Sequence, residues 1–354
     1  MKDQSNRKPT AILCAWHWLW AFLSRWVFLS AAWLLLHYVP VGLAFFPDSR
    51  IAVWLLRHIT STLYRPWGLW FIDYYWLAYT LAGPLYFSGQ RGRFLLANDK
   101  YQALLAFMLR GALRRWGLVK ITWSPLVRLG LLSILLKLFF MPYMVSWGIQ
   151  NISDVWTTIK NPAWDFHSIT VFLIQLCLFV DVTVFGFGYL VESRRLGSDI
   201  RSIDPHWLGW LVCLWCYPPF NSVTFLPFDV KWFPIQIEST QTTKLLFNGV
   251  EALLWGVFAW ASLALGFKAS NLTARGTVQR GPYRWVRHPA YTAKVGVWWV
   301  QGIIFGDYSV GILLAFTVIY GLRAWTEERH LLAVDAEYAT YSQTVPWRFI
   351  PHLL

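Results

Sequence analysis

The chain has 354 residues, of which 56% are hydrophobic, 19% aromatic and only 14% charged. Soluble proteins average about 25% charged residues, and a soluble domain of this size could not cover its surface with so few. The same proportions exclude disordered, collagen-like and disulfide-rich classes. The sequence therefore predicts an integral membrane protein.

The charge balance is basic, with 31 Lys and Arg against 18 Asp and Glu and a formal net charge of +13. In a membrane protein this excess predicts basic loops that set the topology and contact lipid head groups. We expect no nucleic-acid partner, because no soluble basic module with interleaved aromatic residues is present. The four cysteines lie in apolar stretches, and Cys213 and Cys216 lack a second pair, so we expect neither a disulfide framework nor a metal site.

The predicted fold class is an all-α, polytopic transmembrane helical bundle, since eight segments come near the roughly 20 apolar residues of a spanning helix. An apolar stretch before them, Ala11–Ser24, is either an interfacial helix or an extension of the first span. One weak segment lying flat would reduce the count to six or seven. The eight candidates are Trp26–Phe46, Trp67–Phe87, Leu129–Gly148, Ser168–Val191, Trp207–Phe228, Leu245–Phe267, Tyr291–Phe305 and Ser309–Trp325.

The distribution of Lys and Arg over the loops predicts the orientation. Of the 31 cations, 22 fall in the segments that lie inside when the N-terminus is inside, counting Arg323 at the inner end of the last candidate span, and 6 fall in the opposite segments. Inner loops of membrane proteins carry such an excess. The sequence therefore predicts that both the N-terminus and the C-terminus are cytoplasmic and that the number of spans is even.

Two regions depart from a plain bundle. Residues 98–116 combine apolar side chains with Arg110, Arg114 and Arg115, which predicts an interfacial basic helix on the inner membrane surface. The last two candidate spans are short, and about 15 residues at 1.5 Å each cover only ~23 Å of a ~30 Å hydrocarbon core. They predict a tight helical hairpin hung from the inner face.

Polar residues concentrate at the inner ends of this hairpin. Gly281 and Pro282 form a turn signal, and Pro289 suits the first turn of the following helix. The chain therefore delivers Arg287 and His288 to the start of one arm. Glu327 and Glu328 arrive at the inner end of the other arm, where the two sets face each other.

These blocks resemble the isoprenylcysteine carboxyl methyltransferase family. The resemblance rests on the run GPYRWVRHPAY from Gly281 to Tyr291, on Glu327-Glu328 beyond the hairpin, and on the tail from Glu337 to Pro351. It covers roughly residues 245–351. It implies a membrane-embedded enzyme that binds S-adenosylmethionine in a cytosol-facing pocket and methylates a lipophilic acceptor, either a prenyl-cysteine carboxylate or a lipid-like molecule.

The resemblance also implies a division of the chain and a set of site residues. Residues 1–244 would be an N-terminal transmembrane region of unassigned role, and residues 245–354 the methyltransferase-like core. The predicted catalytic residues are Arg287, His288 and Glu328. The predicted cofactor-binding residues are Tyr283, Arg284, Arg287, His288, Pro289, Tyr291, Glu327 and Glu328.

The chemistry of these side chains agrees with such a donor. A carboxylate pair can meet the ammonium or the ribose hydroxyls, an arginine can meet the carboxylate, and aromatic rings can shelter the sulfonium. A carboxylate acceptor needs no base. An amine or hydroxyl acceptor would need one, and His288 is the first candidate.

Some residues leave the prediction open. The three arginines from Arg280 to Arg287 could serve only as topology signals, and Glu327 could pair with Arg323 four residues earlier. The tail block also resembles sterol reductases, so an NADPH-dependent reductase of a sterol-like lipid is the second hypothesis. A non-catalytic membrane protein that retains the fold is the third.

Ionisable residues inside the predicted spans are further candidates. Asp181 stands in the middle of one span, and Lys137 in another is a candidate partner for it, as a structural pair or a functional one. Lys294 follows the motif tyrosine where the resembled family commonly has a small residue, which predicts either snorkelling or a place in the substrate entrance.

Overall fold

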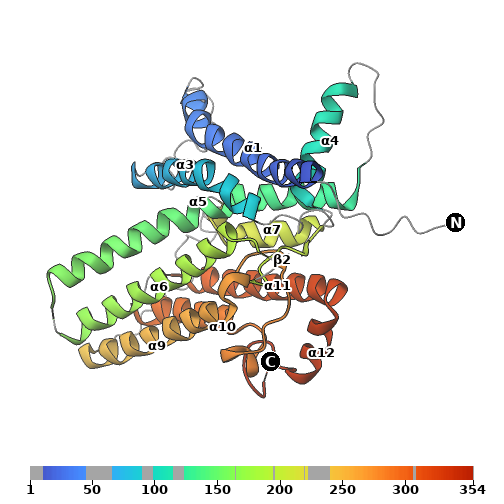
Figure 1. Ribbon diagram of the computed structural model, residues 1–354. Helices are drawn as coiled ribbons and strands as arrows, with labels where there is room; N and C mark the ends of the chain where they lie inside the picture. The colour runs from blue at the N-terminus through green and yellow to red at the C-terminus, as the bar shows by residue number, and fades with distance from the viewer. Residues whose placement is uncertain are drawn as a thin grey trace. The chain divides into compact units, whose positions relative to one another are not determined.

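The structure is a computed structural model that describes residues 11–44, 66–89, 99–114, 123–163, 165–193, 196–218, 220–221, 240–305 and 308–353. The described residues are mostly helical, which confirms the all-α prediction (Figure 1). The chain divides into two compact units, Met1–Pro142 and Tyr143–Leu354. The division falls at Pro142, inside the helix α5 (Pro125–Lys160).

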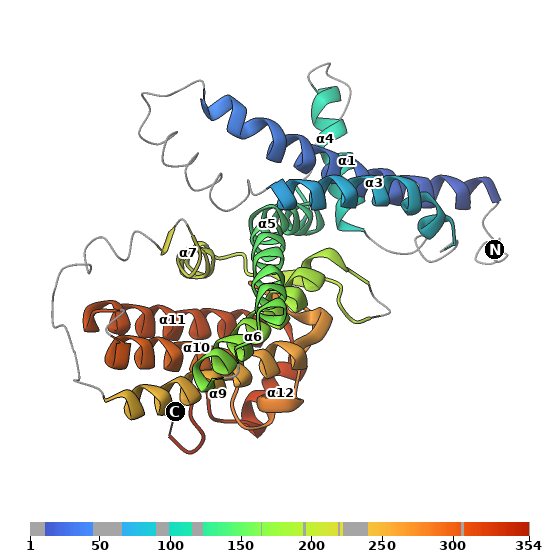
Figure 2. The ribbon, with the colours of Figure 1, turned by 90° about the vertical axis from the view of Figure 1, so that its left-hand side faces the viewer.

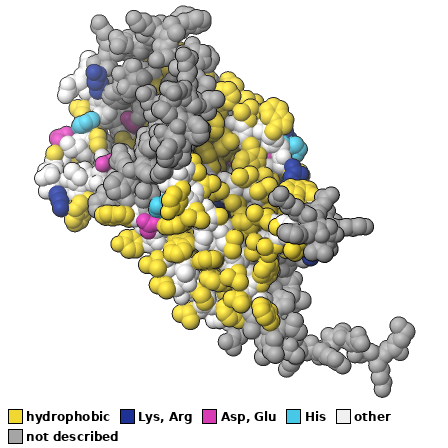
Figure 3. All heavy atoms as spheres, turned by 90° about the horizontal axis from the view of Figure 1, so that it is seen from above, with side chains coloured by type: hydrophobic (Ala, Val, Ile, Leu, Met, Phe, Trp, Pro, Cys, Tyr) yellow, Lys and Arg dark blue, Asp and Glu magenta, His cyan; other side chains and the backbone are white. Residues whose placement is uncertain are grey.

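Five of the described helices are long and apolar enough to cross a membrane, which supports a membrane protein. Large hydrophobic side chains are exposed on them, among them Leu253 and Val318, and Figure 3 shows a face on which hydrophobic side chains predominate. Eight spans, the hairpin and the orientation of the termini stay predictions. The five segments are Trp18–Val39, Pro125–Lys160, Phe166–Leu190, Gln241–Lys268 and Val310–Val334.

In the first unit, α1 (Ala11–Ala44) packs against α3 (Pro66–Gly89) through aromatic side chains. The ring of Phe22 stacks on that of Tyr79 with 5.9 Å between centroids. Because α1 is continuous from Ala11 to Ala44, the stretch Ala11–Ser24 and most of the first predicted span belong to one helix.

The predicted interfacial segment contains α4 (Lys100–Arg114). Asp99 accepts hydrogen bonds from the backbone N–H groups of Tyr101 and Gln102 at its start, at 2.9 and 3.0 Å. Asp99 also forms an ion pair with Arg25 of α1, which ties the two helices together. The position of α4 at the membrane surface stays a prediction.

In the second unit, α9, α10 and α11 lie side by side in both views (Figures 1 and 2), and α9 also packs on α6. A short antiparallel pairing joins Ser202 to Ala274 and Ile203 to Thr273. The helices are α6 (Phe166–Leu190), α7 (Trp207–Trp215), α9 (Gln241–Leu265), α10 (Pro289–Val300), α11 (Val310–Val334) and α12 (Ala336–Thr344). The short elements are β1 (Ser202–Ile203), β2 (Thr273–Ala274), the turns η1 (Gly266–Lys268) and η2 (Gly281–Arg284), and the π-helical turn η3 (Gln301–Phe305).

Several of the predicted spans differ in length from the helices observed; Leu129–Gly148, for example, lies in the longer α5. The segment Trp207–Phe228 contains the nine-residue α7, and residues 222–239 lie outside the described residues. The segment Tyr291–Phe305 contains the end of α10 and the turn η3. The segment Ser309–Trp325 lies in α11, which continues beyond it to Val334.

Candidate active site

The site begins at the turn that leads into α10. Gly281 adopts φ +63°, a conformation that glycine enters without a steric penalty, and a Cβ there would lie 3.0 Å from the Cβ of Ala264. The turn buries Pro282 and Tyr283, and the hydroxyl of Tyr341 donates a 2.7 Å hydrogen bond to the carbonyl of Tyr283. The segment before α10 is therefore fixed against α12.

Arg287, His288 and Glu328 form a buried cluster. Arg287 Nε donates to Glu328 Oε1 at 2.6 Å, and His288 Nε2 lies 3.1 Å from the same oxygen. Arg348 Nε donates to the other oxygen, Oε2, at 2.9 Å. Glu328 is only 4% exposed, so one buried carboxylate gathers three basic side chains.

The C-terminal tail closes over this cluster. The backbone N–H groups of Arg287 and His288 donate to the carbonyls of Trp347 and Arg348, at 3.0 and 2.8 Å. The guanidinium of Arg287 also donates to the carbonyl of Val345, at 2.7 Å. Tail, α10 and α11 are thus joined through a single arginine.

The second carboxylate of the pair faces elsewhere. The hydroxyl of Tyr291 donates a 2.6 Å hydrogen bond to Glu327 Oε2, and both residues line a cavity of ≈160 Å³. A water molecule needs only about 10–15 Å³ measured in this way, so the cavity has room for a small-molecule ligand. Glu327 makes no ion pair with Arg323, which instead donates to the Asn271 side chain.

Aromatic rings and charges share the walls of this cavity. Arg323 lies over the ring of Tyr291 at 4.9 Å and also faces the rings of Tyr217 and Tyr320. The tyrosines that line the cavity are Tyr217, Tyr283, Tyr291, Tyr320, Tyr338 and Tyr341. Among the described residues, its charged lining is Lys268, Arg275, Arg287, Lys294, Arg323, Asp181 and Glu327, in addition to His288.

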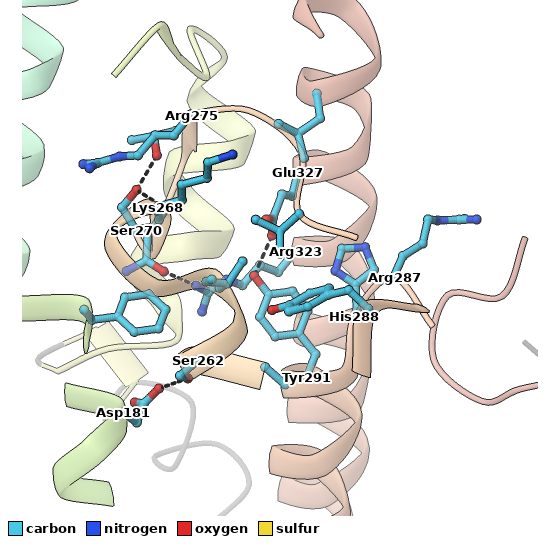
Figure 4. Close-up of a pocket in the computed structure, with 18 of the residues that line it drawn as sticks. Asp181, Ser262, Lys268, Ser270, Arg275, Arg287, His288, Tyr291, Arg323 and Glu327 are labelled. Carbon is cyan, nitrogen blue, oxygen red and sulfur yellow. Dashed lines mark hydrogen bonds between the residues drawn. The ribbon is translucent and has the colours of Figure 1, made fainter. Parts of the chain in front are cut away.

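The two ends of the cavity differ (Figure 4). Lys268, Arg275 and Glu327 lie toward one end, and Asp181 with Ser262 lies at the other. The Ser262 hydroxyl donates to the Asp181 carboxylate. The lining residues one helical turn from Asp181 and from Ser262 are apolar, namely Phe185 in α6 and Phe258 in α9.

Lys294 belongs to the same end of the site as these apolar side chains. Its Nζ lies 5.6 Å from the ring centroid of Phe258 and 5.7 Å from that of Trp298. Trp298 in turn lines a second cavity of ≈140 Å³, together with Ile312, Leu313 and Phe316 of α11 among others. Lys294 therefore lines the first cavity with its ammonium group close to aromatic rings.

Tyr338 places a buried hydroxyl in the cavity wall. The hydroxyl of Tyr338 has no hydrogen-bond partner among the described residues, and the side chain is 6% exposed. Burial raises the pKa of Tyr338 and of Tyr341, so both hydroxyls stay protonated. A buried hydroxyl without a hydrogen-bond partner destabilises the folded protein. A ligand that accepts a hydrogen bond from Tyr338 would remove this cost.

The structure places five of the eight predicted site residues in the cavity wall. Tyr283, Arg287, His288, Tyr291 and Glu327 line the cavity, and Pro289 is the first residue of α10. Arg284 is exposed and is not among the lining residues, and Glu328 lies outside the cavity with its oxygens on basic partners.

Several lining residues did not follow from the sequence motifs. Asp181 and Lys294 stood out as ionisable residues inside apolar segments, but the partner of Asp181 is Ser262, while Lys137 lies over the ring of Tyr101. Arg323 precedes Glu327 by one helical turn, a spacing that could have placed it in the wall. Nothing in the sequence distinguished Asn271.

Neither a metal cluster nor a disulfide is present in the described part of the chain. No group of three His, Cys, Asp or Glu side chains there could hold a metal ion, and Cys177, Cys213 and Cys216 are free thiols.

Comparison with known proteins gives no family. No family model matches the sequence, and neither curated proteins nor solved structures match it.

Proposed function

We propose that this protein is an S-adenosylmethionine-dependent methyltransferase that acts on a lipophilic acceptor at the inner face of a membrane. The observation that carries the proposal is the Glu327 carboxylate, which faces a cavity lined by six tyrosines beside buried Arg287 and His288. The resemblance of residues 245–351 to the isoprenylcysteine carboxyl methyltransferase family adds to it.

The residues present suit the groups of this donor. Glu327 would accept hydrogen bonds from its ammonium or ribose, and a cationic side chain such as Lys268 would meet its carboxylate. The faces of Tyr291 and Tyr320 would shelter the sulfonium, since aromatic faces attract cations. The donor supplies an activated methyl group, and the protein's task is to align it with the acceptor and to exclude water.

Glu328 has another role in this proposal. Its two oxygens are occupied by Arg287, His288 and Arg348, so it would position His288 and the tail rather than touch the donor. Of the two glutamates that the sequence predicts to bind the cofactor, only Glu327 would then contact it.

The experiment is calorimetric titration of the purified protein in detergent with S-adenosylmethionine. We expect saturable binding that Glu327→Gln weakens. The matched control is Glu337→Gln, which changes an exposed glutamate of α12. Absence of binding to the parent protein would sink the proposal.

A second candidate is an NADPH-dependent membrane reductase, and one observation favours it. Among the described residues, five Lys and Arg line the cavity against two carboxylates, a balance that suits a polyphosphate. The same titration with NADPH separates the two. The methyltransferase proposal expects S-adenosylmethionine to bind in the presence of excess NADPH, whereas the reductase expects NADPH to displace it.

A further inference from the structure

We infer that Asp181 is the base of the reaction and that the acceptor is a lipophilic alcohol or amine bound beside Asp181 and Lys294. The inference rests on the proposed methyl transfer and deepens it, because it names the chemical class of the second substrate.

The first ground is the position of Asp181. It lies in α6, within the apolar segment Phe166–Leu190, which is long and apolar enough to cross a membrane. A carboxylate at membrane depth is costly, and such residues usually face a cavity and carry a function. Asp181 is half-buried and lines the cavity.

The second ground is that Asp181 forms no ion pair with Lys294, the cationic side chain nearby. Lys294 lines the same cavity, yet no ion pair joins it to Asp181 or joins either of them to another described residue. The hydrogen bond partner of Asp181 is the uncharged Ser262. Both charged groups therefore remain available to a ligand.

The third ground is the surroundings. Asp181 lies at the end of the cavity opposite Lys268 and Glu327 (Figure 4), and the lining residues one helical turn from it and from Ser262 are the apolar Phe185 and Phe258. The polar end suits the donor and the apolar end suits a lipid-like molecule. The nucleophile of that molecule would then meet Asp181.

The fourth ground is the state of His288. Its Nε2 lies on Glu328, and its ring is held between Tyr291 and Phe349, with centroid distances of 5.2 and 5.8 Å. This arrangement suits a wall of the donor site. A base near the acceptor must come from elsewhere, and Asp181 is the carboxylate at the acceptor end.

The step balances with an acceptor that carries a proton. The acceptor oxygen or nitrogen forms a bond to the methyl carbon, the methyl–sulfur bond of the donor breaks, and the sulfur keeps the electron pair. The proton of the alcohol or amine passes to the Asp181 carboxylate and afterwards to water. A carboxylate acceptor would have no proton to give and would meet Asp181 as a like charge.

The first test identifies the bond formed. The full chain in detergent is incubated with S-adenosylmethionine carrying a tritiated methyl group and with a total membrane lipid extract, and the labelled lipid is treated with strong base. Methyl ethers and methylamines keep their label, whereas methyl esters release it as volatile methanol. Base-stable label is expected. Release of the label as methanol, or donor binding without transfer, would overturn the inference, while absence of donor binding would overturn the proposed function itself.

The second test uses matched variants. Asp181→Asn should lower transfer by about 10²–10⁴-fold, the usual contribution of a general base, and leave the donor dissociation constant within about twofold. The control is Asp154→Asn, the same change in α5, at a residue that does not line the cavity. Asp181→Glu keeps a carboxylate and should retain more transfer than Asp181→Asn. Unchanged transfer in Asp181→Asn would contradict the assignment, and the product analysis above decides the question even where a variant fails to fold.

Discussion

Arg287 and Glu328 stand 41 positions apart and meet through a 2.6 Å hydrogen bond between buried side chains. The contact joins the start of α10 to α11. Because the same guanidinium donates to carbonyls of the tail, this pair holds three segments together. The site is thus built around an ion pair that the ligand need not touch.

Arg287→Ala should be far more damaging than Arg348→Ala. Removal of Arg287 leaves the buried Glu328 carboxylate without its closest cation. Breaking a buried ion pair in this way lowers the free energy of unfolding by about 3–5 kcal/mol. The side chain of Arg348 is 49% exposed, and exposed pairs contribute about 0–1 kcal/mol. Thermal unfolding in detergent measures both variants, and equal losses would contradict this ranking.

The tyrosines Tyr338 and Tyr341 offer a matched pair of hydroxyl deletions. Tyr341→Phe removes the hydrogen bond to the carbonyl of Tyr283 and should cost about 1 kcal/mol of unfolding free energy. Tyr338→Phe removes a hydroxyl that has no partner among the described residues, so stability should stay equal or rise. The affinity for S-adenosylmethionine should fall in Tyr338→Phe, because the bound donor would lose its hydrogen bond to that hydroxyl. Unfolding and binding curves for the two variants test both expectations.

Tyr291→Phe tests how Glu327 is held. The change keeps the ring and removes the 2.6 Å hydrogen bond to the carboxylate. A charge-assisted hydrogen bond contributes about 1.5–3 kcal/mol, so donor affinity should fall by roughly 10- to 100-fold as Glu327 loses its orientation. Titration calorimetry reports the change, and an unaltered dissociation constant would show that Glu327 needs no such support.

Gly188→Ala tests the contact between α6 and the segment that leads into the cavity wall. An added Cβ would lie 1.9 Å from the carbonyl oxygen of Ala269, so the backbone must move, at a cost of about 1–3 kcal/mol or more. The control is Gly256→Ala in α9, where nothing lies within 4 Å of the added Cβ. At Gly256 the better helix propensity of alanine should raise the free energy of unfolding by about 0.5–1 kcal/mol. A milder effect at Gly188 than at Gly256 would refute the packing described.

Part of this site could be predicted from the sequence, because local residue patterns determine where helices begin. The Gly281-Pro282 turn and Pro289 placed His288 at the start of a helix, and the structure has it there. The sequence treated Glu327 and Glu328 as an equivalent pair, whereas neighbouring helical residues point about 100° apart. One therefore faces the cavity and the other faces Arg287.

The long-range contacts could not be predicted. The partnership of Asp181 with Ser262 joins residues 81 positions apart, and the hydrogen bond of Arg323 to Asn271 depends on a loop without a recognisable pattern. The length of α11 beyond the predicted span Ser309–Trp325 likewise depends on partners from other segments, such as Arg287 for Glu328.

The most direct test of the central claim is the binding of S-adenosylmethionine to the purified protein, measured by calorimetry for the parent chain, Glu327→Gln and the Glu337→Gln control. We expect saturable binding to the parent chain and to the control. The affinity of Glu327→Gln should be at least about tenfold lower, because the donor loses one charge-assisted hydrogen bond. No binding to the parent chain, or equal affinity in all three proteins, would contradict this claim.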